Sequence, residues 1–114
     1  IVRGTTSKYI VAMLREAGAK EIHMRISAPP FVNPCYYGTD IDSRDNLIAC
    51  QRTVDAIADY IGADSLGYLS VEGVRTLLGN QPHLGYCTAC FDGHYEVEPP
   101  EEGDKNRFEA SISI

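Results

Sequence analysis

The stretch Ile1-Val2-Arg3-Gly4-Thr5-Thr6-Ser7, followed by KYIVAMLREAG at positions 8–18, decides the fold of this 114-residue chain. Two β-branched apolar residues open the stretch and indicate the end of a strand. A short turn rich in hydroxyl groups follows, and then apolar residues recur at helical spacing. This pattern predicts a helix over residues 7–17, with an N-cap from Thr5, Thr6 or Ser7 and an end at Gly18.

The same reasoning places the next elements along the chain. Residues 22–26 alternate between apolar and polar side chains, which predicts a strand that ends at residues 28–30. Residues 31–42 form a loop. A second helix is expected from Asp42 or Ser43 to Gly62, and its apolar stripe consists of Leu47, Cys50, Val54, Ile57 and Ile61.

The last elements are shorter. Residues 66–69 are expected to form a strand, and Ser70 is expected to cap a helix that runs through Leu78 to Gly79. From position 81 the chain is predicted to be loop-like, and from Glu98 it is acidic, proline-rich and predicted to be mobile.

The order strand end, helix, strand, helix, short strand, helix predicts an α/β fold with an incomplete sheet and flanking helices. Two strands and a strand end do not make an independent sheet. We therefore expect the missing strands upstream of Ile1, which makes the chain a fragment. If the fragment is studied alone, its exposed sheet edge is expected to drive dimerisation or strand exchange.

Charge and composition exclude several classes of function. The net charge of −6 and the pI of about 4.9 argue against binding to nucleic acid or to an anionic membrane. No apolar run approaches the ~20 residues that a membrane span needs. Nothing else indicates export, so we expect the four cysteines to be reduced thiols in the cytoplasm.

Residues 3–7 have the features of an anion cradle. The first turn of a helix presents unpaired N–H groups and the positive end of the helix dipole. Gly4 permits close approach of a ligand to the backbone, the hydroxyls of Thr5, Thr6 and Ser7 add donors, and Arg3 adds a nearby charge. Taken alone, the same residues also fit an ordinary strand-to-helix turn with a Ser/Thr cap.

Three of the four cysteines lie in predicted loops, which favours a shared metal centre. Cys87 and Cys90 form a C-x-x-C motif, and Cys35 lies in a separate loop. Thiolates bind either zinc or an iron–sulfur cluster, and for zinc a loop histidine, His83 or His94, is the candidate fourth ligand. Redox chemistry is disfavoured because Phe91-Asp92-Gly93 indicates a turn rather than a helix start, and simple packing stays open.

The other polar and aromatic residues are given structural roles. Cys50 lies on the apolar stripe of the second helix and is expected in the core. The acidic residues, Asp40 among them, are interpreted as solvated surface. A group of rings near the cysteines in sequence is expected to pack about the metal centre and limit solvent access: Tyr36, Tyr37, Tyr86, Phe91 and Tyr95.

Residues 1–7 resemble the second half of the type I phosphoribosyltransferase fingerprint, in the form found in amidophosphoribosyltransferases. The resemblance extends to about Tyr95, and its most specific further motifs are Pro34-Cys35-Tyr36-Tyr37-Gly38 and Tyr86-Cys87-Thr88-Ala89-Cys90-Phe91-Asp92-Gly93-His94-Tyr95. The resemblance implies that residues 1–95 are the C-terminal part of a phosphoribosyltransferase domain and that residues 96–114 are a tail.

The resemblance also implies ligands. In the family two Asp residues and a Ser precede the matched turn, the acids grip the ribose hydroxyls with Mg²⁺ nearby, and the turn holds the 5′-phosphate. This role carries over to Gly4, Thr5, Thr6 and Ser7, with Arg3 as a matching neighbour. Cys35, Cys87 and Cys90 carry over as three ligands of a [4Fe–4S] cluster with a structural role, whose fourth ligand lies upstream; Cys50 does not.

The implied parent enzyme transfers ammonia from glutamine to phosphoribosyl diphosphate, the entry step of purine synthesis. The implied partners are phosphoribosyl diphosphate, purine nucleotides, the rest of the polypeptide and further copies of it. The fragment alone is expected to be inactive. Two other readings stay open: a zinc-binding interaction module, and another type I phosphoribosyltransferase or non-catalytic binder of phosphoribosyl diphosphate.

Overall fold

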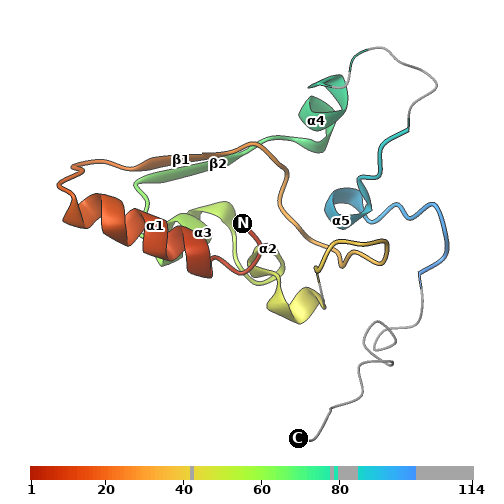
Figure 1. Ribbon diagram of the computed structural model, residues 1–114, viewed down its shortest axis with the longest axis horizontal. Coiled ribbons are helices and arrows are strands. Elements are labelled where there is room, and N and C mark those ends of the chain that lie inside the picture. The colour runs from red at the N-terminus through yellow and green to blue at the C-terminus, as the bar shows by residue number, and fades with distance from the viewer. Residues whose placement is uncertain (42, 78, 80–84, 100–114) are drawn as a thin grey trace, which may run out of the picture.

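A computed structural model describes residues 1–41, 43–77, 79 and 85–99 of the chain (Figure 1). Its elements are α1 (Thr5–Glu16), β1 (His23–Ile26), the 3₁₀ turn η1 (Arg44–Asn46), α2 (Ile48–Gln51), α3 (Val54–Ile61), β2 (Ser65–Tyr68), α4 (Val71–Leu77) and α5 (Ala89–Asp92). The expectations for Asp42, Leu78, His83 and residues 100–114 lie outside the described residues.

The predicted α/β arrangement with an incomplete sheet is confirmed. In the described part of the chain the sheet has two strands, β1 and β2, which pair in parallel with His23 opposite Ser65 and Ile26 opposite Tyr68. Helix α3 contacts both β2 and α1. In Figure 1, α1 and α3 lie together on one side of the strand pair. A parallel pair needs a crossover, and the segment from residue 27 to residue 64 supplies it.

One apolar core joins these elements. Its buried residues come from α1, the residue before β1, α2, α3 and the turn before β2: Val11, Ile22, Ile48, Ile57, Ile61 and Ala63. Leu47, just before α2, has no exposed surface, and Ile57 and Ile61 are almost as deeply buried. Burying a side chain of this kind contributes about 1.5–3 kcal/mol. The core therefore fixes the helix that follows the turn at residues 3–7.

Helix α1 begins two residues earlier than the sequence indicates. Its N-cap is Gly4 and not Thr5, Thr6 or Ser7, and no side chain caps it. Gly4 has φ = 86°, in the left-handed region that side chains rarely adopt. A Cβ atom on Gly4 would also lie 2.9 Å from Ile48 Cδ1. The three hydroxyl residues therefore form the first turn of the helix instead of preceding it.

The prediction of one continuous helix up to residue 61 is wrong. The segment is divided into η1, α2 and α3, and the chain is extended at Arg52 (φ −136°, ψ 148°). Thr53 causes the second restart because its Oγ1 accepts a hydrogen bond from Ala56 N at 3.2 Å, which is N-cap geometry. The break changes the phase of the apolar stripe, so Val54 is 41% exposed.

Cys50 is consequently not a core residue. It lies near the end of the four-residue helix α2 and is exposed, and its thiol donates to the Val32 carbonyl at 3.2 Å. The prediction for the next helix is better, because Ser70 Oγ accepts from Gly73 N at 2.9 Å and caps α4. Strand β2 begins and ends one residue before the predicted range.

A polar junction ties the end of α1 to the sheet. Asp64 Oδ2 accepts from Ile22 N at 2.7 Å and from Arg15 Nη2 at 2.5 Å. The Ile22 N–H and then the Arg15 guanidinium hold the pKa of Asp64 below its ordinary value. The carboxylate therefore contributes stability above its unfolded pKa, and this stability is lost as the pH falls through the lowered folded pKa.

This junction gives a prediction for acid unfolding. In Asp64→Asn the group that titrates is absent, so we expect lower stability at neutral pH but a shallower loss of stability below about pH 4. Both side chains of the pair are more than one-third exposed, so added salt should weaken the effect. Thermal unfolding of both proteins at pH values between neutrality and acid measures the slopes, and parallel slopes below pH 4 would contradict the assignment.

Candidate functional site

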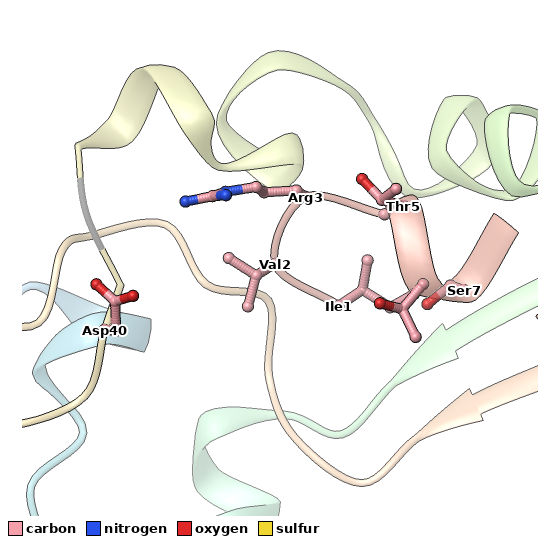
Figure 2. A pocket seen from close by; sticks show the side chains of 8 residues that line it. Ile1, Val2, Arg3, Thr5, Ser7 and Asp40 are labelled. Carbon is pink, nitrogen blue, oxygen red and sulfur yellow. The ribbon is translucent and has the colours of Figure 1, made fainter. Parts of the chain in front are cut away.

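The turn before α1 lines an open cavity of ≈ 530 Å³ (Figure 2). The lining consists of residues 1–7 and Asp40. All five residues that the sequence analysis assigned to an anion cradle, from Arg3 to Ser7, thus share one cavity. The carbonyl of Val2 accepts from Ile48 N at 3.0 Å, which fixes the approach to the turn.

The backbone of this turn suits an anion. The first helical hydrogen bond runs from Lys8 N to Gly4 O at 3.0 Å, so the N–H groups of residues 5–7 have no acceptor within the helix. These groups and the positive end of the helix dipole lie at the same point. No acidic residue occurs in the first turn of α1 to oppose this charge. The side chains of Thr5 and Ser7 project from the first turn of α1 (Figure 2).

Cationic side chains gather near the turn. Lys8 Nζ and Arg52 Cζ each lie 4.9 Å from the centroid of the Tyr60 ring. Tyr60 is also the ring that approaches Gly4 closely. Arg3 extends away from Thr5 and Ser7 in Figure 2 and lines a second hollow with Arg52 and Tyr60. Lys8, Arg52 and Arg3 therefore make the electrostatic potential around the turn more positive. The Arg3 side chain does so without pointing toward Thr5 and Ser7.

Asp40 is the cavity residue that the sequence analysis missed. It was interpreted as solvated surface, but it lines the cavity at the end far from Ser7 (Figure 2). It comes from the loop between β1 and η1, which no periodicity places against the turn. A carboxylate repels a phosphate, so Asp40 is suited to donor groups of a ligand, such as hydroxyls, rather than to the anion itself. No signal in the sequence identifies it.

The loop that carries Asp40 also carries Cys35. Cys35 N donates to the Ile41 carbonyl at 3.0 Å and closes the loop. Burial raises the pKa of the Cys35 thiol, but hydrogen bonds from the backbone N–H groups of Tyr37, Thr39 and Gly38 and from the Thr39 hydroxyl outweigh it, so the pKa lies below its ordinary value. Such donors stabilise a thiolate, which is the form that binds metals.

The sequence analysis expected the whole C-x-x-C motif to lie in a loop, but part of the motif is helical. Thr88 is the N-cap of α5, Cys90 lies inside this one-turn helix, and Gly93 ends it with φ = 75°. No strand of the described chain precedes the motif directly, so it lacks the strand–motif–helix arrangement of thioredoxin-like proteins.

Backbone hydrogen bonds bring the two cysteine segments together. The Cys90 carbonyl accepts from Val32 N at 3.0 Å and from Asn33 N at 3.1 Å. Burial raises the pKa of the Cys90 thiol, and the charges of Cys35 and then Cys87 raise it further. Cys90 is therefore within electrostatic reach of both Cys35 and Cys87.

The predicted donor set consists of three thiols, which suit either zinc or an iron–sulfur cluster. Among the described residues no group of three His, Cys, Asp or Glu side chains lies close enough together to hold one metal ion. A zinc ion requires all its ligands within ~2.3 Å of one centre, whereas a [4Fe–4S] cluster spreads its thiolates over several irons.

Aromatic rings surround the Cys35 segment. The Tyr95 ring lies 5.4 Å from Tyr36 and 6.1 Å from Tyr37, and its hydroxyl donates to the Pro34 carbonyl at 2.7 Å. Burial, followed by the neighbouring Tyr36 and thiol charges, raises the pKa of Tyr95 to about 12. The Phe31 and Phe91 rings are 5.0 Å apart. Of the five rings expected around the cysteines, Tyr37 and Tyr86 are exposed to solvent, at 46% and 54%.

No described helix is long and apolar enough to cross a membrane. No family model matches the chain. Among curated proteins, it is 54% identical to a chloroplastic amidophosphoribosyltransferase of Glycine max over 101 residues, which are 89% of this chain and 18% of that protein. It is 50% identical to the amidophosphoribosyltransferase of Bacillus subtilis over 86% of this chain and 21% of that protein.

Solved structures give the same result. The chain is similar to the glutamine phosphoribosylpyrophosphate amidotransferase of B. subtilis complexed with ADP and GMP, with a TM-score of 0.79 and 48% identity. The match covers 90% of this chain and 23% of that chain. The chain therefore spans about a fifth of the length of the curated relatives that it matches.

Proposed function

Because the chain is similar to one segment of the amidophosphoribosyltransferases over about nine-tenths of its length, we propose that it is a C-terminal part of such an enzyme. The parent reaction would make 5-phosphoribosylamine from phosphoribosyl diphosphate and glutamine. In this proposal residues 1–95 complete a phosphoribosyltransferase domain and residues 96–114 are its tail.

Arg3, Gly4, Thr5, Thr6 and Ser7 would hold the 5′-phosphate of the substrate. The observation that carries this assignment is the cavity lined by residues 1–7, with helix N–H groups and hydroxyls at its wall. These residues would act by binding and orientation, since holding the sugar phosphate in place makes the displacement at C1 effectively intramolecular. Purine nucleotides carry the same 5′-phosphate, so the same turn is suited to them.

Cys35, Cys87 and Cys90 would hold a [4Fe–4S] cluster together with a fourth ligand from the rest of the polypeptide. The support is the proximity of Cys90 to Cys35 and Cys87, the N–H groups around Cys35 and the rings beside it. When bound, the cluster would supply a structural cross-link between the C-terminal segments and the body of the enzyme.

The remaining components lie outside this chain in the proposal. An acidic pair with Mg²⁺ and the glutaminase that releases ammonia would come from the rest of the polypeptide, so residues 1–114 alone would be inactive. The assembly would be a homo-oligomer. Free thiols fit a reducing compartment such as the cytoplasm. The similar protein of Glycine max is chloroplastic.

The experiment joins residues 1–114 to the upstream part of its gene and measures glutamine-dependent release of diphosphate from phosphoribosyl diphosphate. We expect activity in the joined protein and none in residues 1–114 alone. Thr6→Val should raise the KM about tenfold or more, because a hydroxyl bond to a charged group contributes ~1.5–3 kcal/mol.

Thr76→Val is the matched control, since the Thr76 hydroxyl donates within α4 to the Gly73 carbonyl at 2.7 Å. It should leave the KM unchanged. An inactive but folded joined protein, or equal KM values for the two variants, would contradict the proposed role of the turn.

A further inference from the structure

Thr88, the residue after Cys87 in the C-x-x-C motif, is buried and hydrogen-bonded to side chains outside the motif. It is only 7% exposed and is the buried polar side chain of the described chain. Its Oγ1 donates to Asp92 Oδ2 at 2.7 Å and accepts from Arg75 Nη2 at 3.2 Å. A buried hydroxyl with both roles filled is held in one rotamer.

Asp92 completes a triangle with Thr88 and Arg75. Its Oδ2 accepts from Arg75 Nη2 at 2.8 Å in addition to the Thr88 hydroxyl, and its Oδ1 accepts from His94 N at 2.8 Å. The Asp92 side chain is 21% exposed and the Arg75 side chain is 60% exposed, so the carboxylate is the more shielded partner of this ion pair. Arg75 belongs to α4, which is separated in sequence from the cysteine motif.

Helix α5 needs such support. It has four residues, and a single turn does not form alone because helix nucleation is unfavourable. On one side, Val32 N and Asn33 N bind the Cys90 carbonyl and attach α5 to the Cys35 segment. On the other side, Arg75 attaches it to α4 through Thr88 and Asp92. Cys90 lies within α5, and Cys87 directly precedes its N-cap residue, Thr88.

We propose that Arg75, Thr88 and Asp92 are positioning residues that fix Cys87 and Cys90 in the spacing that their metal centre requires. None of the three touches the metal centre itself in this proposal. They act through the backbone of α5, and α4 thereby becomes part of the cluster site. This inference rests on the cluster assignment of the proposed function.

The physical reason is the sensitivity of metal sites to the groups behind their ligands. Removing an outer partner of a ligand typically lowers metal affinity or activity about 10–100-fold. Thr88 lies between the two ligands in sequence, so its rotamer bears on the separation of both thiols. Loss of the Thr88–Asp92 bond should loosen the turn and expose the cluster to solvent and oxygen.

The test uses the joined, anaerobically purified holoprotein and follows bound iron and visible cluster absorbance during exposure to air. We expect Thr88→Val and Asp92→Asn to lose the cluster about tenfold faster than the parent protein. Thr88→Ser keeps the hydroxyl and should restore the parental rate. Arg75→Met should show an intermediate rate, because the Thr88–Asp92 bond remains.

Two controls separate positioning from general destabilisation. Asp64→Asn breaks the Arg15–Asp64 pair, which joins α1 to the sheet, and Thr53→Val removes the N-cap of α3. Both should lower the melting temperature of the protein while leaving the rate of cluster loss at the parental value. Melting temperatures of all variants are measured alongside.

The outcomes distinguish the inference from the proposed function. If the parent holoprotein binds no iron, the cluster assignment fails. If it binds iron and Thr88→Val loses the cluster no faster than Thr53→Val, or Thr88→Ser fails to restore the rate, the positioning role is overturned and the cluster assignment stands.

Discussion

Replacement of Gly4 by alanine is expected to destabilise the fold and to abolish tight binding at the turn. The left-handed conformation of Gly4 (φ 86°) costs a residue with a side chain ~1–2 kcal/mol. The added Cβ would lie 2.9 Å from Ile48 Cδ1 and 3.1 Å from Tyr60 Cε1, and overpacking of this kind costs about 1–3 kcal/mol. The sum is a large part of the stability of a small domain.

The same change should act on ligand binding. Relief of the contact with Ile48 must move the helix start, and the N–H groups of residues 5–7 move with it. We therefore expect the affinity of the joined protein for phosphoribosyl diphosphate to fall by more than tenfold, or ~1.4 kcal/mol. Thermal unfolding and ligand titration measure the two effects separately.

Gly18→Ala provides the matched control. Gly18 also has a positive φ, 99°, but a Cβ there would have no neighbour within 4 Å. This variant should show the backbone cost alone, about 1–2 kcal/mol, with unchanged affinity. Equal losses of stability in the two variants would contradict the close packing of Gly4, and unchanged affinity in Gly4→Ala would remove the turn from the binding site.

The second large effect is expected for Cys90→Ser. Cys90 is the thiol whose surroundings connect it to both Cys35 and Cys87, and a serine hydroxyl is a poor ligand for iron. We expect the joined protein to lose essentially all bound iron and visible cluster absorbance. The structural cross-link disappears with the cluster, so the melting temperature should also fall.

Cys50→Ser is the control for this experiment. Cys50 is exposed and its thiol donates to the Val32 carbonyl, a bond that a serine hydroxyl can retain. Iron content should therefore equal that of the parent protein. Retention of iron by Cys90→Ser would refute the ligand assignment, and loss of iron from Cys50→Ser would show that the fourth ligand had been misassigned.

Local elements with strong signals could be predicted from the sequence. The helix α1, the alternation around β1 and the Ser70 cap of α4 are all short-range features, so residue order alone reveals them, although Val11 is the buried residue of α1 and Ile10 and Leu14 are exposed. The anion-cradle residues are also recognisable, because a small turn before an amphipathic helix is continuous in sequence. In the structure these residues line one cavity, and the ligand of that cavity remains a proposal.

The predictions failed where a side chain capped a new helix within a predicted one, or where a contact with a distant residue decided the backbone conformation. Thr53 offers its own side chain as a cap and divides a segment whose apolar spacing fits one helix, and Cys50 is exposed as a result. Gly4, in its left-handed conformation, is the N-cap residue in place of the expected Thr5, Thr6 or Ser7. Its lack of a side chain lets it pack against Ile48 and Tyr60.

The sequence by itself determined the α/β class, the helix-start turn at residues 3–7 and the choice of Cys35, Cys87 and Cys90 as candidate ligands. These depend on side-chain type and short spacing. Only the tertiary structure placed Asp40 in the cavity of the turn and joined Arg75 to Thr88 and Asp92. Such contacts arise when buried segments pack and leave polar groups that must find partners, and their pairing depends on the three-dimensional path of the chain.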